Sequence, residues 1–229
     1  MQMSSQNRPK ALEDPLDYLP CSKIVECDKG HEIYSPEGPS ANLYLIISGM
    51  VTVERVAGDG SRVLVDIYKT DELLGESALI GLCDTHEYAA AFDDVKLMMW
   101  TRTDVEALVL RQPRLGVALL QTFTQRTIEL AERIESFSSE QIEHRVARCL
   151  SRLCNRLGQP MDGGAIRMMP ITHELLSRYV GTSREIVTLH MNQFQKLGYV
   201  RYSRTEIVVY PDALRKRFGI SRIANHATT

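Results

Sequence analysis

A helical seam in the middle of this 229-residue chain constrains the fold more than any other feature. Between residues 116 and 137, successive seam positions are separated by four and three residues in strict alternation, which is the a/d spacing of a heptad repeat. This spacing predicts a helix that pairs with a second copy of itself. A helix that only covers a neighbouring domain is the alternative, and both can hold because Leu119 and Ile128 lie off the seam and could pack inward. The seam consists of Gly116, Leu120, Phe123, Thr127, Leu130, Ile134 and Phe137.

The part of the chain up to the end of this helix and the part after it differ in charge. Residues 1–139 carry 13 Lys and Arg against 22 Asp and Glu, whereas residues 140–229 carry 14 against 7. The resulting charges, −9 and +7, add to the net −2 of the whole chain. A basic half attached to an acidic half indicates that the C-terminal part meets a polyanion, and nucleic acid is the first candidate.

Length and composition limit the number of domains and the compartment. A chain of 229 residues suits two small domains. No apolar run has the length needed to cross a bilayer, and the polar start at residues 1–10 lacks the apolar segment of a signal peptide. Five cysteines without framework spacing fit a reducing compartment. We therefore expect a cytoplasmic protein with no membrane partner and a flexible tail at residues 1–18.

The N-terminal half has the pattern of an all-β unit. Short strand-like runs at residues 43–47, 50–56 and 62–68 are broken by turn signals such as Ser48-Gly49 and Gly58-Asp59-Gly60. This pattern predicts a small barrel or jelly roll. A short helix should follow, with Asp104 in its first turn and its end near Gln112-Pro113.

The C-terminal half begins with an amphipathic helix predicted at residues 140–157. Four arginines occupy much of one side, and we expect them to lie on a solvated face: Arg145, Arg148, Arg152 and Arg156. The Gly- and Pro-rich segment 158–170 should be a loop or a tight pair of strands.

Residues 171–210 follow the order helix, tight turn, helix and two short strands. Thr172 can cap the first helix, and Gly181 supplies a turn where φ is positive. The second helix should run from about Ser183 to Leu197, followed by a hairpin wing made of residues 199–202 and 206–210. Its buried face should contain Ile186, Val187, Met191, Phe194 and Leu197.

Three segments of this region form a recognisable pattern. They are Ile171-Thr172-His173-Glu174-Leu175-Leu176, Val180-Gly181-Thr182-Ser183-Arg184-Glu185 and Ile207-Val208-Val209-Tyr210. Together they resemble the helix-turn-helix and wing of the cyclic-AMP receptor protein family, also called the CRP/FNR family. The resemblance covers nearly the whole chain, because the strand Asn42–Gly49, Gly75-Glu76-Ser77, the Gln112-Pro113 helix start and the long dimer helix recur in the same order in that family.

This resemblance implies an α+β fold in three parts. Residues 19–112 would form a cyclic-nucleotide-binding-like β-roll, or jelly roll, acting as the sensor domain. Residues 113–138 would form the dimerisation helix, and residues 139–229 a winged helix-turn-helix. The implied function is that of a transcription regulator and not an enzyme. Its partners would be double-stranded DNA, a second copy of the chain and, in an activator, RNA polymerase.

Base reading is expected at the start of the second helix, which lies in the major groove. Arg184 can donate two hydrogen bonds to guanine, Glu185 can accept from a cytosine amino group, and Thr188 lies one turn later. The family's recognition Arg-Glu pair falls on Arg184 and Glu185, whereas Leu189 stands in place of a second base-reading arginine. Alternatively, Glu185 completes a capping box with Thr182 and does not touch DNA. The phosphate-contact candidates are Thr172, Thr182, Ser183, Arg201, Ser203 and Arg204.

The sensor half departs from the cyclic-AMP-binding members of the family. Gly75-Glu76 is kept, but His86-Glu87 stands where those members have the Arg-Ser pair that clamps the cyclic phosphate. Leu130-Ala131 replaces the hydroxyl residues that read adenine. Cyclic AMP is therefore not expected as the effector, and Glu76 could instead only cap the turn after Gly75. The candidate pocket comprises Gly75, Glu76, Ser77, His86, Glu87, Arg126 and Leu130.

Redox and metal sensing remain alternatives for a regulator of this fold. Cys21 and Cys27 form a C-x5-C pair, as in the family's oxygen-sensing branch, but a cluster normally requires four thiolates and Cys83 is remote. An iron-sulfur cluster is therefore not expected. Cys83, Asp84, His86 and Glu87 are metal-capable, yet such a set more often forms a turn, so no metal site is predicted.

Two other classes of protein are less consistent with the residues. A cupin-like enzyme or ligand-binding protein would need a histidine-rich metal site, and the β-half contains only His31 and His86. A pure interaction protein would bind a partner through the basic half without sequence preference for DNA. The interpretation that the residues favour is a homodimer on a pseudo-palindromic operator with half-sites about one helical turn apart. The residues leave open whether an effector is needed, and haem, cyclic di-GMP and a small apolar ligand are the candidates if one is.

Overall fold

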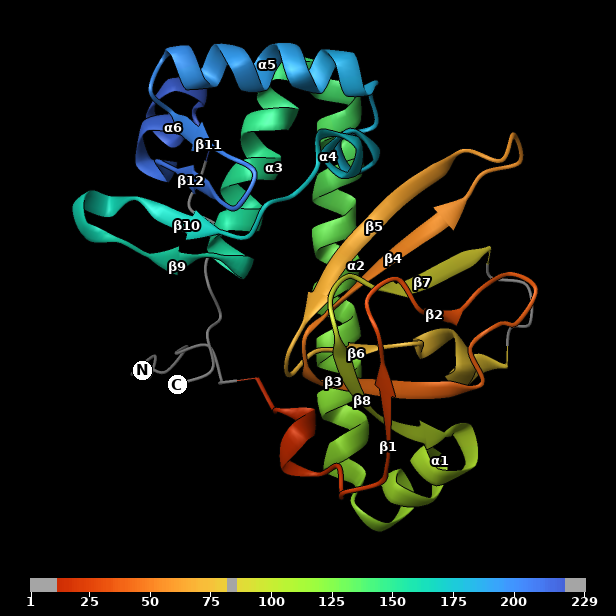
Figure 1. Ribbon diagram of the computed structural model, residues 1–229. Coiled ribbons are helices and arrows are strands. Elements are labelled where there is room, and N and C mark those ends of the chain that lie inside the picture. Colours follow the sequence, from red (N-terminus) through yellow and green to blue (C-terminus); the bar gives the residue numbers. More distant parts are fainter. Residues whose placement is uncertain (1–11, 82–85, 221–229) are drawn as a thin grey trace, which may run out of the picture.

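The computed structural model describes residues 12–81 and 86–220 (Figure 1). A β-roll lies at one end and a helix-rich domain at the other, and a long helix runs alongside both. Most of the expected tail, together with Cys83 and Asp84, lies outside the described residues. The expected combination of β-roll, long helix and winged helix-turn-helix is confirmed.

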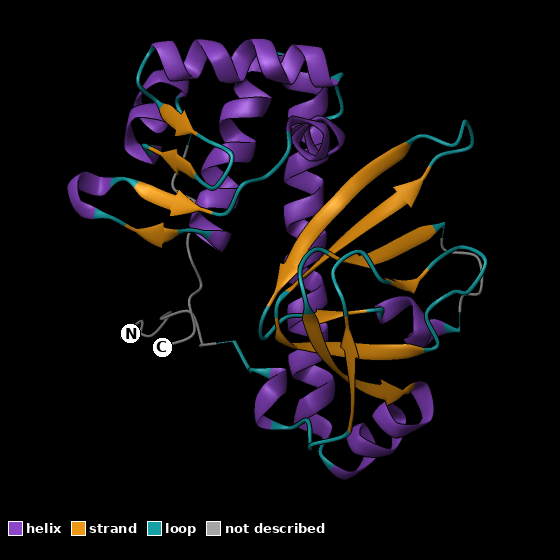
Figure 2. Ribbon diagram, viewed as in Figure 1, coloured by secondary structure: helices purple, strands orange, loops and turns teal. Residues whose placement is uncertain are grey.

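Two antiparallel sheets of four strands form the β-roll within the described residues, clearly separate from the strands of the other domain (Figure 2). Buried and more exposed side chains alternate along their strands. In the strand 50–56, Val51 and Val53 are buried while Thr52 between them is partly exposed. The first sheet runs β1 (Lys23–Cys27), β8 (Val95–Thr101), β3 (Asn42–Ser48) and β6 (Leu73–Leu74). The second runs β2 (Glu32–Tyr34), β7 (Glu87–Ala91), β4 (Met50–Val56) and β5 (Arg62–Lys69).

Short helices complete the roll: η1 (Pro15–Asp17), η2 (Glu76–Ile80) and α1 (Arg102–Arg111). Thr101 caps α1 by accepting a hydrogen bond from the backbone N–H of Asp104, and the Asp104 carboxylate accepts one from Thr101 in return. The predicted short helix with Asp104 in its first turn is confirmed.

The long helix α2 spans Pro113–Ser139. Its inner face packs against the roll through Leu115 and Leu119, so the inward packing expected of Leu119 is confirmed. Ile128, for which the same was expected, is 49% exposed, and that expectation is wrong.

An apolar stripe remains on the outer side of α2. Leu120 is 67% exposed and Ile134 66% exposed. Two positions of the predicted seam are instead used within the protomer: Phe123 packs against the cluster around Trp100, and the Phe137 ring lies against Gly181. We define the exposed stripe as Val117, Leu120, Thr124, Thr127, Ile128, Ala131 and Ile134.

The C-terminal domain consists of helices around a small sheet. Its core contains the fully buried side chains of Leu150, Leu153, Val187, Met191 and Phe194. The segment 158–170 contains two paired strands, which was one of the two predicted alternatives. Leu197, predicted to be buried, is 52% exposed because it follows the last helical residue. The elements are α3 (Ile142–Leu157), β9 (Gln159–Pro160), η3 (Asp162–Gly164), β10 (Ile166–Met168), α4 (His173–Val180), α5 (Arg184–Lys196), β11 (Val200–Tyr202), β12 (Ile207–Val209) and α6 (Pro211–Phe218).

Arginines join the two domains. Arg133 of α2 donates hydrogen bonds to the carbonyls of Leu64 (2.6 Å), Val65 (2.7 Å) and Tyr179 (2.7 Å), which belong to the roll and to α4. Arg152 and Arg156 of α3 are only 15% and 20% exposed. The expectation that they lie on a solvated face is wrong, since both pair with carboxylates of the β-roll.

In the part of the chain that the structure describes, no helix combines the length and apolar character needed to cross a membrane.

Candidate nucleic-acid interface and sensor pocket

The turn between α4 and α5 is built by local hydrogen bonds. Thr172 caps α4, its hydroxyl accepting from the Leu175 N–H at 3.1 Å. Gly181 ends α4 with φ of +70°, a left-handed conformation that favours glycine. Ser183 then caps α5, its hydroxyl accepting from the Ile186 N–H at 3.4 Å.

This cap excludes the predicted capping box of Thr182 with Glu185, although the Glu185 carboxylate still takes part in local hydrogen bonds at the start of α5. The first residue of α5 is Arg184 and its N-cap is Ser183, so Thr182 does not form a capping box with Glu185. Hydrogen bonds from the backbone N–H of Glu185 and from the Ser183 hydroxyl lower the pKa of the exposed Glu185 carboxyl. Glu185 is therefore an ionised acceptor at the exposed start of the helix, beside the exposed Arg184.

Thr188 is less available than the sequence indicated. Its hydroxyl donates to the Arg184 carbonyl at 2.8 Å and lies 2.9 Å from Nδ1 of His173. Since the hydroxyl has one proton, His173 Nδ1 must be the donor in the second contact. Burial, and then the charge of Arg184, lower the pKa of His173. The Thr188 hydroxyl thus ties α5 to the first turn of α4.

Three of the phosphate-contact candidates, Thr172, Ser203 and Arg204, line a cleft of about 240 Å³ between the start of α4 and the wing. The other three do not line it: Ser183 and Arg201 are exposed and Thr182 is half-buried. The cleft lining comprises Pro170, Ile171, Thr172, His173, Tyr202, Ser203, Arg204 and Ile207.

Two residues of this interface were missed from the sequence. His173 and Tyr202 both line the cleft, and their rings meet edge to face with centroids 5.3 Å apart. The Tyr202 hydroxyl donates to the Asn192 side chain at 2.6 Å, which links the wing to α5. These are tertiary contacts, and the only local signal for them was the aromatic residue in the wing strand.

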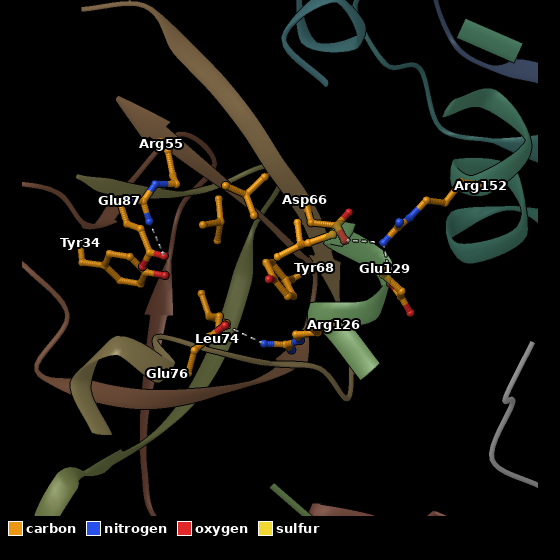
Figure 3. Close-up of a pocket in the computed structure, with 13 residues that line it drawn as sticks. Tyr34, Arg55, Asp66, Tyr68, Leu74, Glu76, Glu87, Arg126, Glu129 and Arg152 are labelled. Atoms are coloured by element: carbon orange, nitrogen blue, oxygen red, sulfur yellow. Dashed lines mark hydrogen bonds and ion pairs between the residues drawn. The ribbon is translucent and has the colours of Figure 1, made fainter. Parts of the chain in front are cut away.

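The sensor pocket is a cavity of about 140 Å³ where the β-roll meets α2 and α3 (Figure 3). Of the predicted pocket residues, Glu76, Glu87, Arg126 and Leu130 line it. Gly75, Ser77 and His86 are not among the lining residues. The lining residues that the sequence did not reveal are Tyr34, Val53, Arg55, Val65, Asp66, Tyr68, Leu74, Glu129 and Arg152.

Gly75 precedes the lining residue Glu76 and does not line the pocket itself. Its φ is +80°, and a Cβ there would lie 2.5 Å from the Asn42 carbonyl oxygen. The residue caps η2 without any side-chain hydrogen bond, so Glu76 does not act as that cap. Glu76 instead points to Arg126, with Oε1 3.3 Å from Nη1.

The guanidinium of Arg126 is committed to the protein. Besides Glu76 it donates to the Leu73 carbonyl and lies over the Tyr68 ring, 4.6 Å from its centroid. The other lining arginines also face carboxylates: Arg55 lies 4.0 Å from Glu87, and Arg152 pairs with Asp66 and Glu129.

Glu87 adds negative charge at the opposite wall. Burial, and then the charge of Glu76, raise the pKa of this carboxyl. A phosphate would have to approach these carboxylates, and each arginine lining the described pocket already has a carboxylate partner.

The cysteines give no support for a cluster. Cys21 is exposed and Cys27 is buried in β1, where burial raises the pKa of its thiol. Across residues 12–81 and 86–220, no three His, Cys, Asp or Glu side chains are grouped so that they could hold a metal ion. Cys83 and Asp84, two of the four metal-capable residues in the sequence, lie outside the described residues.

Comparison with known proteins agrees with this architecture. Residues 24–112 match the cyclic nucleotide-binding domain, and residues 144–217 match the Crp-like helix-turn-helix domain. A CRP-like cAMP-activated global transcriptional regulator of Mycobacterium tuberculosis is 26% identical over 186 residues, covering 81% of this chain and 83% of the relative. The global nitrogen regulator of Synechococcus elongatus is 23% identical over 200 residues, covering 86% and 90%.

Solved structures share the fold. FixK2 from Bradyrhizobium japonicum superposes with a TM-score of 0.74 at 18% identity, covering 85% of this chain and 96% of that one. A CRP/FNR-family transcriptional regulator from Thermus thermophilus gives a TM-score of 0.70 at 24% identity, covering 86% and 99%.

Proposed function

Because the chain belongs to the CRP/FNR family of transcription regulators and carries its DNA-binding helix-turn-helix, we propose that it binds a pseudo-palindromic operator as a homodimer. The observation that carries the proposal is the exposed Arg184-Glu185 pair at the start of α5. The helix forms the outermost layer of its domain (Figure 1), with its buried face turned to the core. The proposed compartment is the cytoplasm, and an activator would also contact RNA polymerase.

Arg184 and Glu185 carry the proposed base reading. Arg184 donates to guanine O6 and N7, and Glu185 accepts from a cytosine amino group, each contact contributing about 1–3 kcal/mol of discrimination. Arg201, Ser203 and Arg204 of the wing hold the phosphate backbone and fix the position of the domain without reading sequence.

The dimer is proposed from the exposed stripe of α2. All of its residues except Ile128 follow the alternating three- and four-residue spacing of a helix pair, and leaving Leu120 and Ile134 in water is unfavourable. Pairing two copies along α2 would bury the stripe and present two recognition helices, one to each half-site.

The effector is proposed not to be cyclic AMP, although a relative from Mycobacterium tuberculosis is named as cAMP-activated. The support is the sensor pocket, where Arg126 is held by Glu76 and Glu87 stands on the opposite wall. An anionic phosphate gains little where the cations are already neutralised.

Selection of sites from a random duplex library tests the proposal, using purified protein without added nucleotide. A palindromic motif is expected. Arg184→Ala should lose discrimination at the guanine of the half-site by about 1–3 kcal/mol, whereas Arg111→Ala in α1, which removes the same charge at the far end of the protein, should select the wild-type motif. Retention of full discrimination by Arg184→Ala would contradict the readout. A motif that emerges only after cyclic AMP is added would contradict the effector proposal.

A further inference from the structure

We infer that Leu189 reads a thymine by apolar contact with its 5-methyl group, which makes Leu189 a specificity-determining residue. The inference rests on the proposed function, since it assigns a base preference to the same recognition helix.

Leu189 occupies an unusual place on α5. The opposite face of the helix is fully buried through Val187, Met191 and Phe194. The outward face is polar except at Leu189, which is 64% exposed. Because residues four apart lie on the same side of a helix, Leu189 follows Glu185 directly along the face that meets the groove.

The neighbouring polar side chains are already engaged within the protein. The Thr188 hydroxyl bonds to the Arg184 carbonyl and to His173, and the side-chain oxygen Oδ1 of Asn192 accepts from the Tyr202 hydroxyl. After Arg184 and Glu185, Leu189 is therefore the next exposed side chain along the outward face of α5. It makes no hydrogen bond within the protein that a contact with a base would have to replace.

A leucine side chain has one way to distinguish bases in the major groove. It has no donor or acceptor, so it cannot satisfy the polar edge atoms of guanine, adenine and cytosine that its approach would remove from water. Thymine alone presents a methyl group there. Burying this methyl against Leu189 removes apolar surface of both partners from water. The half-site should therefore contain a thymine next to the base pairs read by Arg184 and Glu185.

Replacing thymine by deoxyuridine tests the contact, because this change removes the methyl group and leaves the hydrogen-bonding edge intact. In the selected operator, each thymine is replaced in turn, at the same place in both half-sites. Replacement of the thymine that contacts Leu189 should weaken binding of the wild type by about fourfold per half-site, the effect expected for one buried methyl group. The Leu189→Ala variant should bind this deoxyuridine duplex and the thymine duplex almost equally.

Matched variants make the result specific. Leu197→Ala removes an exposed leucine just past the end of the same helix and should keep the wild-type preference for thymine. Leu189→Arg places a donor fork at the position and should shift the preference there from thymine to guanine. Circular dichroism shows whether each variant is folded.

The outcomes separate the two proposals. Failure of the wild type to select any motif would reject the proposed function itself. A selected motif in which no deoxyuridine replacement weakens binding would reject the role of Leu189 alone. That role is also rejected if Leu189→Ala discriminates thymine from deoxyuridine as well as the wild type does.

Discussion

Asp66 of β5 and Arg152 of α3 pair at 3.2 Å across the boundary between the β-roll and the C-terminal domain, and both side chains also line the sensor pocket. Arg156 joins them by donating to Asp66 and, through Nη2, to both oxygens of Glu72 at 2.9 and 2.8 Å. A wall of the pocket is thus the same ion-pair network that holds α3 against the roll (Figure 3). Any group that enters the pocket and competes for Arg152 acts directly on the domain boundary.

Asp66→Asn should destabilise the protein by about 2 kcal/mol, because it leaves two largely buried arginines with one carboxylate fewer. Arg152 retains Glu129 and Arg156 retains Glu72, so the loss stays below that of an isolated buried pair. Urea unfolding at pH 7 measures the change.

The control for this variant is Glu106→Gln, which removes the carboxylate of an exposed i,i+4 pair with Arg102. It should change the free energy of unfolding by less than about 0.5 kcal/mol. An equal, small effect of both substitutions would show that the Asp66 network does not hold the domains together.

Leu120→Asp combined with Ile134→Asp should convert the proposed dimer into a monomer. Each change places a charge in the exposed stripe, which should cost at least about 2 kcal/mol of association free energy. Sedimentation at micromolar concentration measures the result. Leu110→Asp on α1, at a side chain that is 83% exposed, should leave the dimer intact. A dimeric double variant would exclude the stripe as the interface.

His173 should make stability decline on the acidic side of neutrality. Burial and Arg184 lower its pKa from the usual 6.5, so folding favours the neutral ring. This contribution is fully present above pH 6.5 and is lost as the pH falls through the lowered pKa. Between pH 7 and pH 5, the wild type should therefore lose more free energy of unfolding than His173→Gln. The exposed His31→Gln serves as the reference, and equal pH profiles for wild type and His173→Gln would contradict the prediction.

Glu87→Gln should stabilise the ligand-free protein at pH 7. Burial and Glu76 raise the pKa of Glu87, so its protonated form is favoured by folding, and this benefit disappears as the pH rises through the raised pKa. Glutamine stays neutral throughout, so the advantage of the variant should be largest near neutral pH and vanish near pH 4. Melting temperatures across this range measure it, with the exposed Glu26→Gln as control. A less stable variant at pH 7 would show that the carboxylate is favoured in the pocket.

Local signals predicted the elements of the fold. The Thr172 cap, the turn at Gly181 and the wing depend on neighbours in the sequence, and each lies where it was expected. The sequence did not decide which residue caps α5, because Thr182 and Ser183 are adjacent and both can cap a helix. In the structure the turn after Gly181 makes Ser183 the N-cap.

Contacts between distant segments could not be predicted in the same way. The sequence shows Arg152 and Arg156 on the polar side of a helix, but their partners Asp66 and Glu72 lie more than 75 residues earlier. Tyr34 and Tyr68 reach the sensor pocket from different strands for the same reason. Heptad spacing likewise cannot tell whether Phe123 faces a second copy or its own β-roll. The roles assigned to individual DNA-contact residues remain predictions.

The contact of Phe137 with Gly181 helps to set the angle at which α5 is held around the axis of α2. Arg145 strengthens the junction by donating to the carbonyls of both residues, at 3.3 and 3.4 Å. Each residue inserted into α2 upstream of this junction would turn the attached domain by about 100° around the helix axis. Changes in chain length should therefore be tolerated in the turn at residues 161–165 but not between Leu120 and Phe137, where a single insertion would direct α5 away from the half-site proposed for it.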